Sequence, residues 1–388
     1  MQIGVGILNF RYKNEVEEIN MYKSYKYRLL PNEKQKHCID SIFKALHQLR
    51  VLYAQDYKED KKIASINVRM LLSKYSKKDV NINKCDESAV CHELFLLKDE
   101  KDAVLSLSTR IRQSYTTSYF RYYKGEENVL TDTHIFLPTV GYVKYINSRS
   151  IITFKMKSFI VSKDYDNKYY LTIVALCEAV NNNNSLDIKN SIGLDYSSKY
   201  FIVDNNGTRL SCFHSFRDNK EKLNKLEAKL GKLKKEGDKK KYAKELRKYF
   251  KLHRKISNKR NDFLHKTSTS IIKKYDYIFV EDLDLADMKR KYNLTLATID
   301  NAYAKFIKML EYKAKENNKK FIKVERYFPS SKKCSNCSYI NNNLTLDMRS
   351  WTCPKCGVTH DRDTNSAINI RNRGIEKITS SYRADSLR

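Results

Sequence analysis

The chain has 388 residues, 41% of them hydrophobic, and its 75 Lys and Arg outnumber its 45 Asp and Glu to give a net charge of +30. This apolar fraction excludes a disordered polycation, and the length suits two or three domains. Such a charge surplus attracts polyanions, which favours a nucleic acid partner over a general enrichment in lysine. No run approaches the roughly 18 apolar residues of a membrane span, and the Ile3 to Phe10 stretch lacks a basic leader, so we expect a cytoplasmic protein with no membrane partner.

The first half of the chain is predicted to contain a strand, then helices, then more strands. Residues 1–20 read as a weakly ordered extension, because Met21 could itself be a start. Residues 21–30 alternate polar and apolar side chains, as an edge strand does. Helical spacing follows over residues 32–125, with one apolar face formed by Ile39, Ile42, Phe43, Leu46 and Leu49.

Alternating runs then predict β-structure as far as a polar linker. The predicted strands cover residues 141–146, 151–155 and 169–176. The asparagine tract at 181–184 predicts a domain boundary.

The second half begins with three predicted strands in residues 191–213, two of them joined by an Asn205-Asn206-Gly207 turn. Residues 217–260 hold 19 Lys and Arg against 6 Asp and Glu and predict a basic helical hairpin broken at Gly237-Asp238. Such a run is often only a solvated helix face, but this imbalance favours contact with nucleic acid. The remaining predicted elements, before a loose polar tail of about a dozen residues, are a strand at 277–280, a helix at 302–317, a strand at 321–324 and a helix at 364–372.

Four of the nine cysteines form a pattern typical of zinc sites. Cys334 and Cys337 are followed, after fifteen residues, by Cys353 and Cys356. Two such pairs can complete a tetrahedron of thiolates, which leaves no open position for catalysis, so we predict one structural zinc rather than two unrelated thiol turns. The five scattered cysteines are predicted to be core residues: Cys38, Cys85, Cys91, Cys177 and Cys212.

Several acidic residues stand where predicted strands end or a helix begins. Asp195 and Glu281 end strands, while Asp361 and Asp363 precede the last helix. Three carboxylates that converge in space can hold two Mg²⁺ ions for displacement at phosphorus. Taken singly, each is more often a helix cap or a surface acid, and Asp363 in particular could cap its helix. The residues alone therefore leave two interpretations: a metal-dependent nuclease, or acids that are only helix caps and surface residues.

Resemblance to a known family favours the nuclease. The chain from about residue 22 resembles the TnpB family of transposon-encoded RNA-guided nucleases, which are related to compact type V CRISPR effectors. The segments that carry the resemblance are Tyr25 to Asn32, Leu137-Pro138, Gly141 to Lys144, Gly193 to Asp195, Val280 to Leu283, Tyr327 to Cys334, Trp351 to Gly357 and His360 to Ile370. Tyr196 stands where Leu or Val is frequent in the family, and Ser366 replaces a usual Ala.

The resemblance implies an α+β multidomain fold. An RNase H-like RuvC nuclease domain would contain an inserted zinc ribbon, and a β-barrel wedge domain would contain an inserted helical recognition domain. The implied segments are 1–31 (extension and first wedge strand), 32–125 (recognition), 126–184 (remaining wedge), 185–333 (RuvC with the hairpin), 334–356 (zinc module) and 357–388 (RuvC C-terminal segment and tail).

The resemblance also implies the site residues and the partners. The family's three ligands for two Mg²⁺ ions fall on Asp195, Glu281 and Asp363, with Asp361 as the alternative to Asp363. We expect a protein monomer with a guide RNA that cuts double-stranded DNA next to a short flanking motif, and that associates with a prokaryotic nucleoid when bound to DNA. The guide could come from a transposon-end RNA or from a CRISPR array.

Contacts to nucleic acid are expected from basic residues of the wedge and the hairpin: Arg28, Lys144, Lys234, Lys235, Lys241, Arg254 and Arg260. Two other functions remain open: a guided repressor that binds DNA without cutting it, and a transposase that joins strands.

Overall fold

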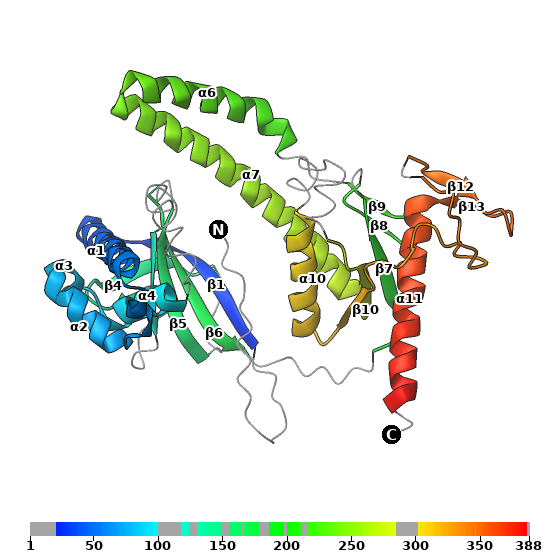
Figure 1. Ribbon diagram of the computed structural model, residues 1–388, viewed down its shortest axis with the longest axis horizontal. Helices are drawn as coiled ribbons and strands as arrows, with labels where there is room; N and C mark the ends of the chain where they lie inside the picture. Colours follow the sequence, from blue (N-terminus) through cyan, green and yellow to red (C-terminus); the bar gives the residue numbers. More distant parts are fainter. Residues whose placement is uncertain are drawn as a thin grey trace. The chain divides into compact units, whose positions relative to one another are not determined.

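The computed structural model describes residues 21–99, 118–123, 130–148, 155–164, 167–177, 186–197, 200–211, 216–284, 302–345 and 347–385. The fold is α+β, as predicted, and forms two compact units, residues 1–178 and 179–388 (Figure 1). The predicted extension at 1–20 and the asparagine tract at 181–184 lie outside the described residues.

The first unit contains an antiparallel six-stranded sheet in the order β2-β5-β6-β1-β4-β3. Its strands are β1 (Met21–Leu30), β2 (Ser118–Tyr123), β3 (His134–Leu137), β4 (Gly141–Ile146), β5 (Lys155–Lys163) and β6 (Tyr169–Cys177). Strand β1 pairs with both β4 and β6, so the prediction of an edge strand is wrong. Alternation reveals which face of a strand is buried, but not whether its edges are paired.

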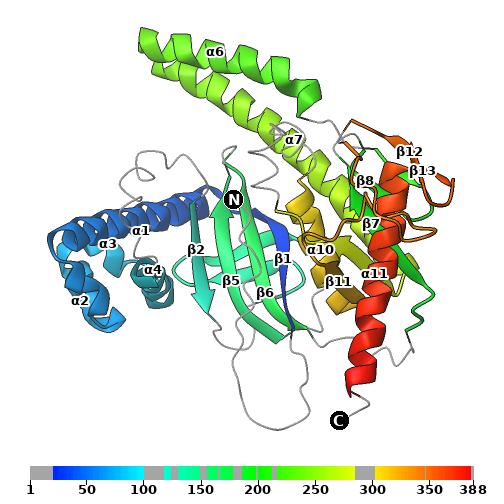
Figure 2. The same ribbon diagram turned by 45° about the vertical axis from the view of Figure 1, so that its right-hand side comes forward.

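Helices and this sheet share one hydrophobic core. The helices are α1 (Glu33–Glu59), the 3₁₀ helix η1 (Lys61–Ser65), α2 (Val68–Lys78), α3 (Val80–Asn83) and α4 (Glu87–Asp99) (Figure 2). Asn32 starts α1 with a capping box, since its side chain accepts the Gln35 N–H at 2.9 Å and its own N–H reaches the Gln35 side chain at 3.0 Å. The five residues of the predicted apolar face of α1 are all buried. Residues 118–123, predicted as helix, form β2 instead, because this aromatic-rich run suits a pleated surface.

The second unit contains a mixed five-stranded sheet in the order β11-β10-β7-β8-β9. Its strands are β7 (Ser191–Tyr196), β8 (Ile202–Asp204), β9 (Arg209–Leu210), β10 (Tyr277–Glu281) and β11 (Lys320–Val324). Strand β10 runs parallel to both β7 and β11, while β8 is antiparallel to its neighbours β7 and β9. The predicted three strands and their hairpin turn are confirmed.

Alternate residues of these strands face two different helical layers. Ile192, Leu194, Ile278 and Val280 belong to a core shared with α7 (Lys239–Lys274) and α10 (Tyr303–Glu316). On the other face, Phe279 packs with residues of α11 (Arg362–Asp385). Because side chains alternate along a strand, Gly193, Asp195 and Glu281 fall on the face that α11 covers.

Helix α11 lies unusually close to the sheet. A Cβ atom added to Gly193 would lie 2.2 Å from the Ala367 carbonyl oxygen, and one added to Gly374 would lie 2.0 Å from the Phe279 ring. The prediction of a helix ending near residue 372 and a loose tail is wrong, since α11 continues to Asp385. Gly374 resembles a stop signal, but here it permits close packing.

The basic hairpin is confirmed and is longer than predicted. Helix α6 (Lys220–Glu236), preceded by the 3₁₀ helix η2 (Arg217–Asn219), ends at Gly237 in the left-handed conformation. The Asp238 side chain caps α7, which continues beyond residue 260 to Lys274. Glu245, buried between the helices, lies 3.2 Å from Lys229 and 2.9 Å from Lys248. Of the helices in the described part of the chain, none combines the length and apolar character that crossing a membrane requires.

Candidate active site and metal centre

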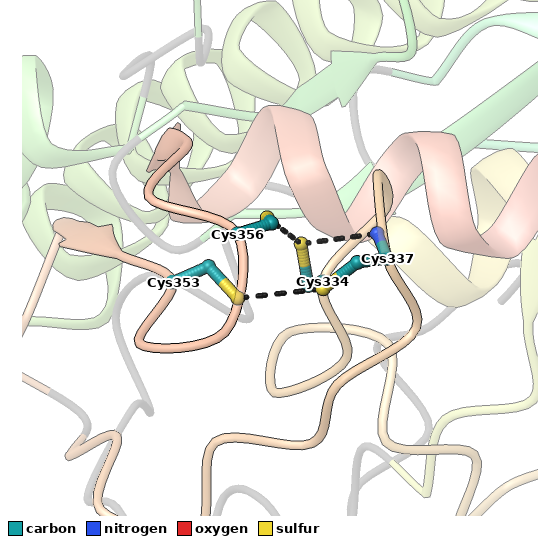
Figure 3. A group of neighbouring side chains, drawn as sticks. All are labelled: Cys334, Cys337, Cys353 and Cys356. Carbon is teal, nitrogen blue, oxygen red and sulfur yellow. Dashed lines mark hydrogen bonds between the residues drawn. The ribbon is translucent and has the colours of Figure 1, made fainter.

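The four predicted zinc ligands converge in space (Figure 3). One pair comes from the turn after β11, and the other from the loop between β12 (Ser350–Thr352) and β13 (Thr359–Asp361). The Sγ atoms of Cys334 and Cys356 are 3.7 Å apart, and those of Cys337 and Cys353 are 3.6 Å apart. A tetrahedron of thiolates with Zn–S bonds of about 2.3 Å has edges of about 3.8 Å. The cluster therefore fits a zinc ion, and cysteine fills all four positions.

Two residues that sequence reasoning did not single out support this cluster. Nε2 of His360 lies 3.0 Å from Sγ of Cys334, and its ring packs against Trp351. The Asn365 side chain accepts the Ser335 N–H at 3.0 Å and donates to the Lys333 carbonyl at 2.8 Å. Asn365 lies in the first turns of α11, so these bonds fix the cysteine module against the start of that helix. The only sequence signal was their place in the His360 to Ile370 segment that carries the family resemblance.

Asp195 and Glu281 lie side by side at the carboxyl ends of parallel strands. The last paired residues of β7 and β10 are Leu194 and Val280, and the two acids follow them directly. Adjacent strands are about 4.8 Å apart, so the two carboxylates emerge at the same edge of the sheet. Asp195 is buried, with 8% of its surface exposed.

The structure distinguishes Asp363 from Asp361. Asp361 accepts the N–H and the hydroxyl of Thr364, at 2.9 and 2.8 Å, and pairs with Arg209 at 2.7 Å. Asp361, and not Asp363 as considered above, is therefore the cap of α11. Although burial alone would raise it, these contacts hold the pKa of Asp361 below its usual value. Asp363 instead influences the pKa of Asp195, as described below.

Two buried serines form hydrogen bonds between β7 and α11, each to a carboxylate of the other element. The hydroxyl of Ser366, on α11, donates to Oδ1 of Asp195 at 2.8 Å. The hydroxyl of Ser197, just after β7, donates to Oδ2 of Asp363 at 3.1 Å. The sequence marked Ser366 only as a departure from the family pattern, and Ser197 carried no signal.

Burial and neighbouring charges raise the pKa of Asp195 and of Glu281. Burial raises the pKa of Asp195 well above its usual value, and the charges of Asp363 and Glu281 raise it further against the bond from Ser366. Burial, with a contribution from the Asp282 charge, raises the pKa of Glu281 to about 7. Oxygen donors that repel one another in a buried site suit a hard divalent cation. The three carboxylates are not gathered as tightly as the thiols, which form the one such group of potential ligands among the described residues.

Tyr303 is a further polar group near these acids. Its hydroxyl is buried and finds no hydrogen-bond partner among the residues that the structure describes. Burial raises the pKa of Tyr303, and the charges of Asp195 and Glu281 add to the effect. Its position at the start of α10 did not indicate in the sequence that it lies near these acids.

Glu281 also lines an open pocket of about 380 Å³. The wall includes Tyr327, whose side chain is 91% exposed, together with Lys332 and Arg362. The pocket thus combines an aromatic surface, two cations and a candidate metal ligand.

The predicted nucleic-acid contacts differ in their surroundings. Lys144 of β4 and Lys234, Lys235 and Lys241 of the hairpin are exposed, and Lys241 pairs with Asp238 at 3.1 Å. Arg28 is half-buried, donates to the Tyr169 carbonyl at 3.2 Å and lies over the Tyr170 ring. Arg254 and Arg260 are half-buried along α7. The exposed lysines are accessible for phosphate contacts, whereas Arg28 is held by its own sheet.

Comparisons with known proteins cover both halves of the chain. Residues 175–291 match the OrfB_IS605 family model, described as "Probable transposase", and residues 303–370 match the "Cas12f1-like, TNB domain" model. A protein of Escherichia coli K12, provisionally named an RNA-guided DNA endonuclease, is 27% identical over 279 residues, 67% of each chain.

Two further relatives match shorter stretches. A Streptomyces pristinaespiralis protein with the same provisional name is 38% identical over 124 residues, 32% of this chain and 31% of that protein. TnpB-like protein L79 of Acanthamoeba polyphaga mimivirus is 27% identical over 132 residues, 32% of this chain and 24% of that protein. The matched stretches thus span less than a third of these two relatives.

Among solved structures, the cryo-EM structure of the Cas12f1-sgRNA-target DNA complex is similar, with a TM-score of 0.49 and 15% identity over 91% of this chain and 99% of that one. The family models and sequence relatives agree with the motifs that the sequence carries. The second half of the chain therefore carries an OrfB_IS605 segment at residues 175–291 and a Cas12f1-like TNB domain at residues 303–370, and its sequence relatives include TnpB-like proteins.

Proposed function

We propose that the chain is an RNA-guided DNA endonuclease that cuts target DNA at a single RuvC-like site formed by Asp195, Glu281 and Asp363. The observation that carries the proposal is the position of these acids, two at adjacent strand ends and one in the first turn of α11. The provisional names of the bacterial relatives support the activity.

Each acid has a defined part in the proposed site. Asp195 and Glu281 stand at the ends of adjacent parallel strands, and Asp363, in the first turn of α11, accepts the hydroxyl of Ser197 just after β7. When bound, two Mg²⁺ ions would activate water and stabilise the leaving oxygen of the phosphodiester. The raised pKa of Glu281 means that cation binding competes with a proton near neutral pH.

The remaining parts of the chain would bind nucleic acid and support the site. We propose that the exposed lysines of the α6–α7 hairpin hold the RNA scaffold and the guide–target duplex through phosphate contacts. The sheet of the first unit and its helices would act as wedge and recognition domains, which bind guide RNA and the flanking DNA motif. The cysteine module would carry one structural zinc and buttress α11 through Asn365.

The test is to purify the protein with its copurifying RNA, sequence that RNA, and add matching DNA with Mg²⁺. We expect cleavage that Asp195→Ala abolishes. Cutting by Asp195→Ala would refute the assigned site. Tight target binding without any cutting would indicate a guided repressor, and joined DNA products would indicate strand transfer.

A further inference from the structure

Ser197 and Ser366 form a reciprocal pair of contacts between β7 and α11. Asp195 and Ser197 are two residues apart at the end of β7, and Asp363 and Ser366 are three residues apart in the first turns of α11. Each serine donates to the acid of the other segment and not to that of its own: Ser197 to Asp363 at 3.1 Å and Ser366 to Asp195 at 2.8 Å. The end of β7 and the start of α11 are therefore connected by two crossed hydrogen bonds, each from a serine of one segment to the carboxylate of the other.

The direction of the bond from Ser197 is set by its surroundings. Its oxygen accepts the Tyr200 N–H at 3.3 Å, which leaves the hydroxyl proton for Asp363. Both serines are buried, with 3% and 1% of their surfaces exposed, so water does not compete freely for these bonds. An ionised carboxylate only accepts hydrogen bonds, so both serines suit the charged forms of their partners.

The crossed bonds also restrict which carboxylate oxygens face the site. Ser366 donates to Oδ1 of Asp195, so Oδ2 of that acid can face a cation. Ser197 donates to Oδ2 of Asp363, and Oδ1 of Asp363 lies 3.6 Å from Nη1 of the exposed Arg349, which a cation would have to displace. Two like charges in a buried site repel one another, and without these bonds their side chains could rotate apart. A fixed arrangement lowers the cost of assembling the ligands when a cation binds.

We propose that Ser197 and Ser366 are positioning residues that orient Asp195 and Asp363 for divalent cation binding; this inference rests on the function proposed above. The close approach that Gly193 permits brings α11 within reach of β7 for both bonds.

The test measures cation binding without cleavage. Mn²⁺ is titrated into the full-length chain, free of nucleic acid, and the unbound ion is followed by electron paramagnetic resonance. The protein with Asp195→Ala defines the signal of this site. Ser366→Ala and Ser197→Ala are compared with Ser380→Ala, an exposed serine of α11 whose hydroxyl donates to the Glu376 carbonyl. Circular dichroism at the titration temperature confirms that each variant is folded.

We expect Ser366→Ala and Ser197→Ala each to raise the Mn²⁺ concentration for half-saturation roughly three- to tenfold, while Ser380→Ala leaves it unchanged. Unchanged or tighter binding in both folded serine variants would overturn the inference. Should one variant fail to fold, the other decides alone. If the wild-type chain binds Mn²⁺ no better than Asp195→Ala does, the proposed function itself fails, and the two failures are thereby distinguished.

Discussion

One carbon atom added at Gly193 should separate α11 from β7 and so disrupt the candidate site. In Gly193→Ala the new Cβ would lie 2.2 Å from the Ala367 carbonyl oxygen and 2.8 Å from the Arg371 backbone nitrogen. Backbone atoms cannot rotate away as a flexible side chain can. Restoring an ordinary contact therefore requires α11 to move from β7 by about 1.2 Å.

That displacement exceeds what the serine contacts tolerate. The Ser366 to Asp195 bond is 2.8 Å long, and the movement would stretch it to about 4 Å, beyond the limit of about 3.5 Å for a hydrogen bond. Overpacking of this kind costs ~1–3 kcal/mol, which lowers the melting temperature of a unit of this size by roughly 3–10 °C. We expect weaker Mn²⁺ binding and slower target cleavage as well.

The assays are thermal unfolding of the full-length chain and cleavage by the RNA-loaded protein. Gly231→Ala is the matched control, because it places the same methyl group on α6 with no atom within 4 Å. Alanine in a helix is favoured over glycine, so this control should be neutral or stabilising by up to ~1 kcal/mol. If Gly193→Ala melts and cuts like the wild type, the close packing of α11 does not organise the site.

Three further predictions concern the zinc, the pH dependence and the hairpin. Cys353→Ser should reduce bound zinc from about one ion per chain to well below one, as measured by mass spectrometry of the metal. A wild-type chain that contains no zinc would contradict the assignment of the cluster. The pKa of Glu281 rises from 4.5 to about 7 on folding, so the free energy of unfolding of protein free of Mg²⁺, measured by urea denaturation, should fall by up to ~3 kcal/mol between pH 4.5 and pH 7. Glu281→Gln should lack this loss, and a variant with the same pH profile as the wild type would refute the prediction. Lys234→Gln with Lys235→Gln should reduce the slope of log RNA affinity against log salt by roughly 1.5, and an unchanged slope would exclude both lysines from phosphate contact.

Local chemistry explains which elements could be predicted from the sequence. The Asn205-Asn206-Gly207 turn and the Gly237-Asp238 break are short-range signals, and both ended elements where expected. The length of α11 could not be predicted, because Gly374 serves a contact with Phe279 that is distant in the sequence. The interior position of β1 likewise depends on partners more than a hundred residues away.

In the candidate site too, some residues could be predicted from local sequence and others depend on contacts between distant segments. Cysteine spacing predicted the thiol cluster, because both pairs are local turns joined by one arm. The sequence suggested Asp195 and Glu281 because each ends an apolar strand, but the choice of Asp363 over Asp361 depended on the family resemblance. The serine contacts could not be foreseen, since the hydrogen bond from Ser366 spans 171 residues of chain.

The assignment of the acids is tested most directly by cleavage of guide-matched DNA with Mg²⁺, comparing Asp195→Ala, Asp363→Ala and Asp361→Ala in the RNA-loaded protein. We predict that Asp195→Ala and Asp363→Ala lose cleavage by a hundredfold or more, on the scale of losing an essential catalytic group. Asp361→Ala should keep most of its activity, because this residue caps α11 and pairs with Arg209. Cleavage that survives Asp195→Ala, or that depends on Asp361 and not on Asp363, would contradict the account.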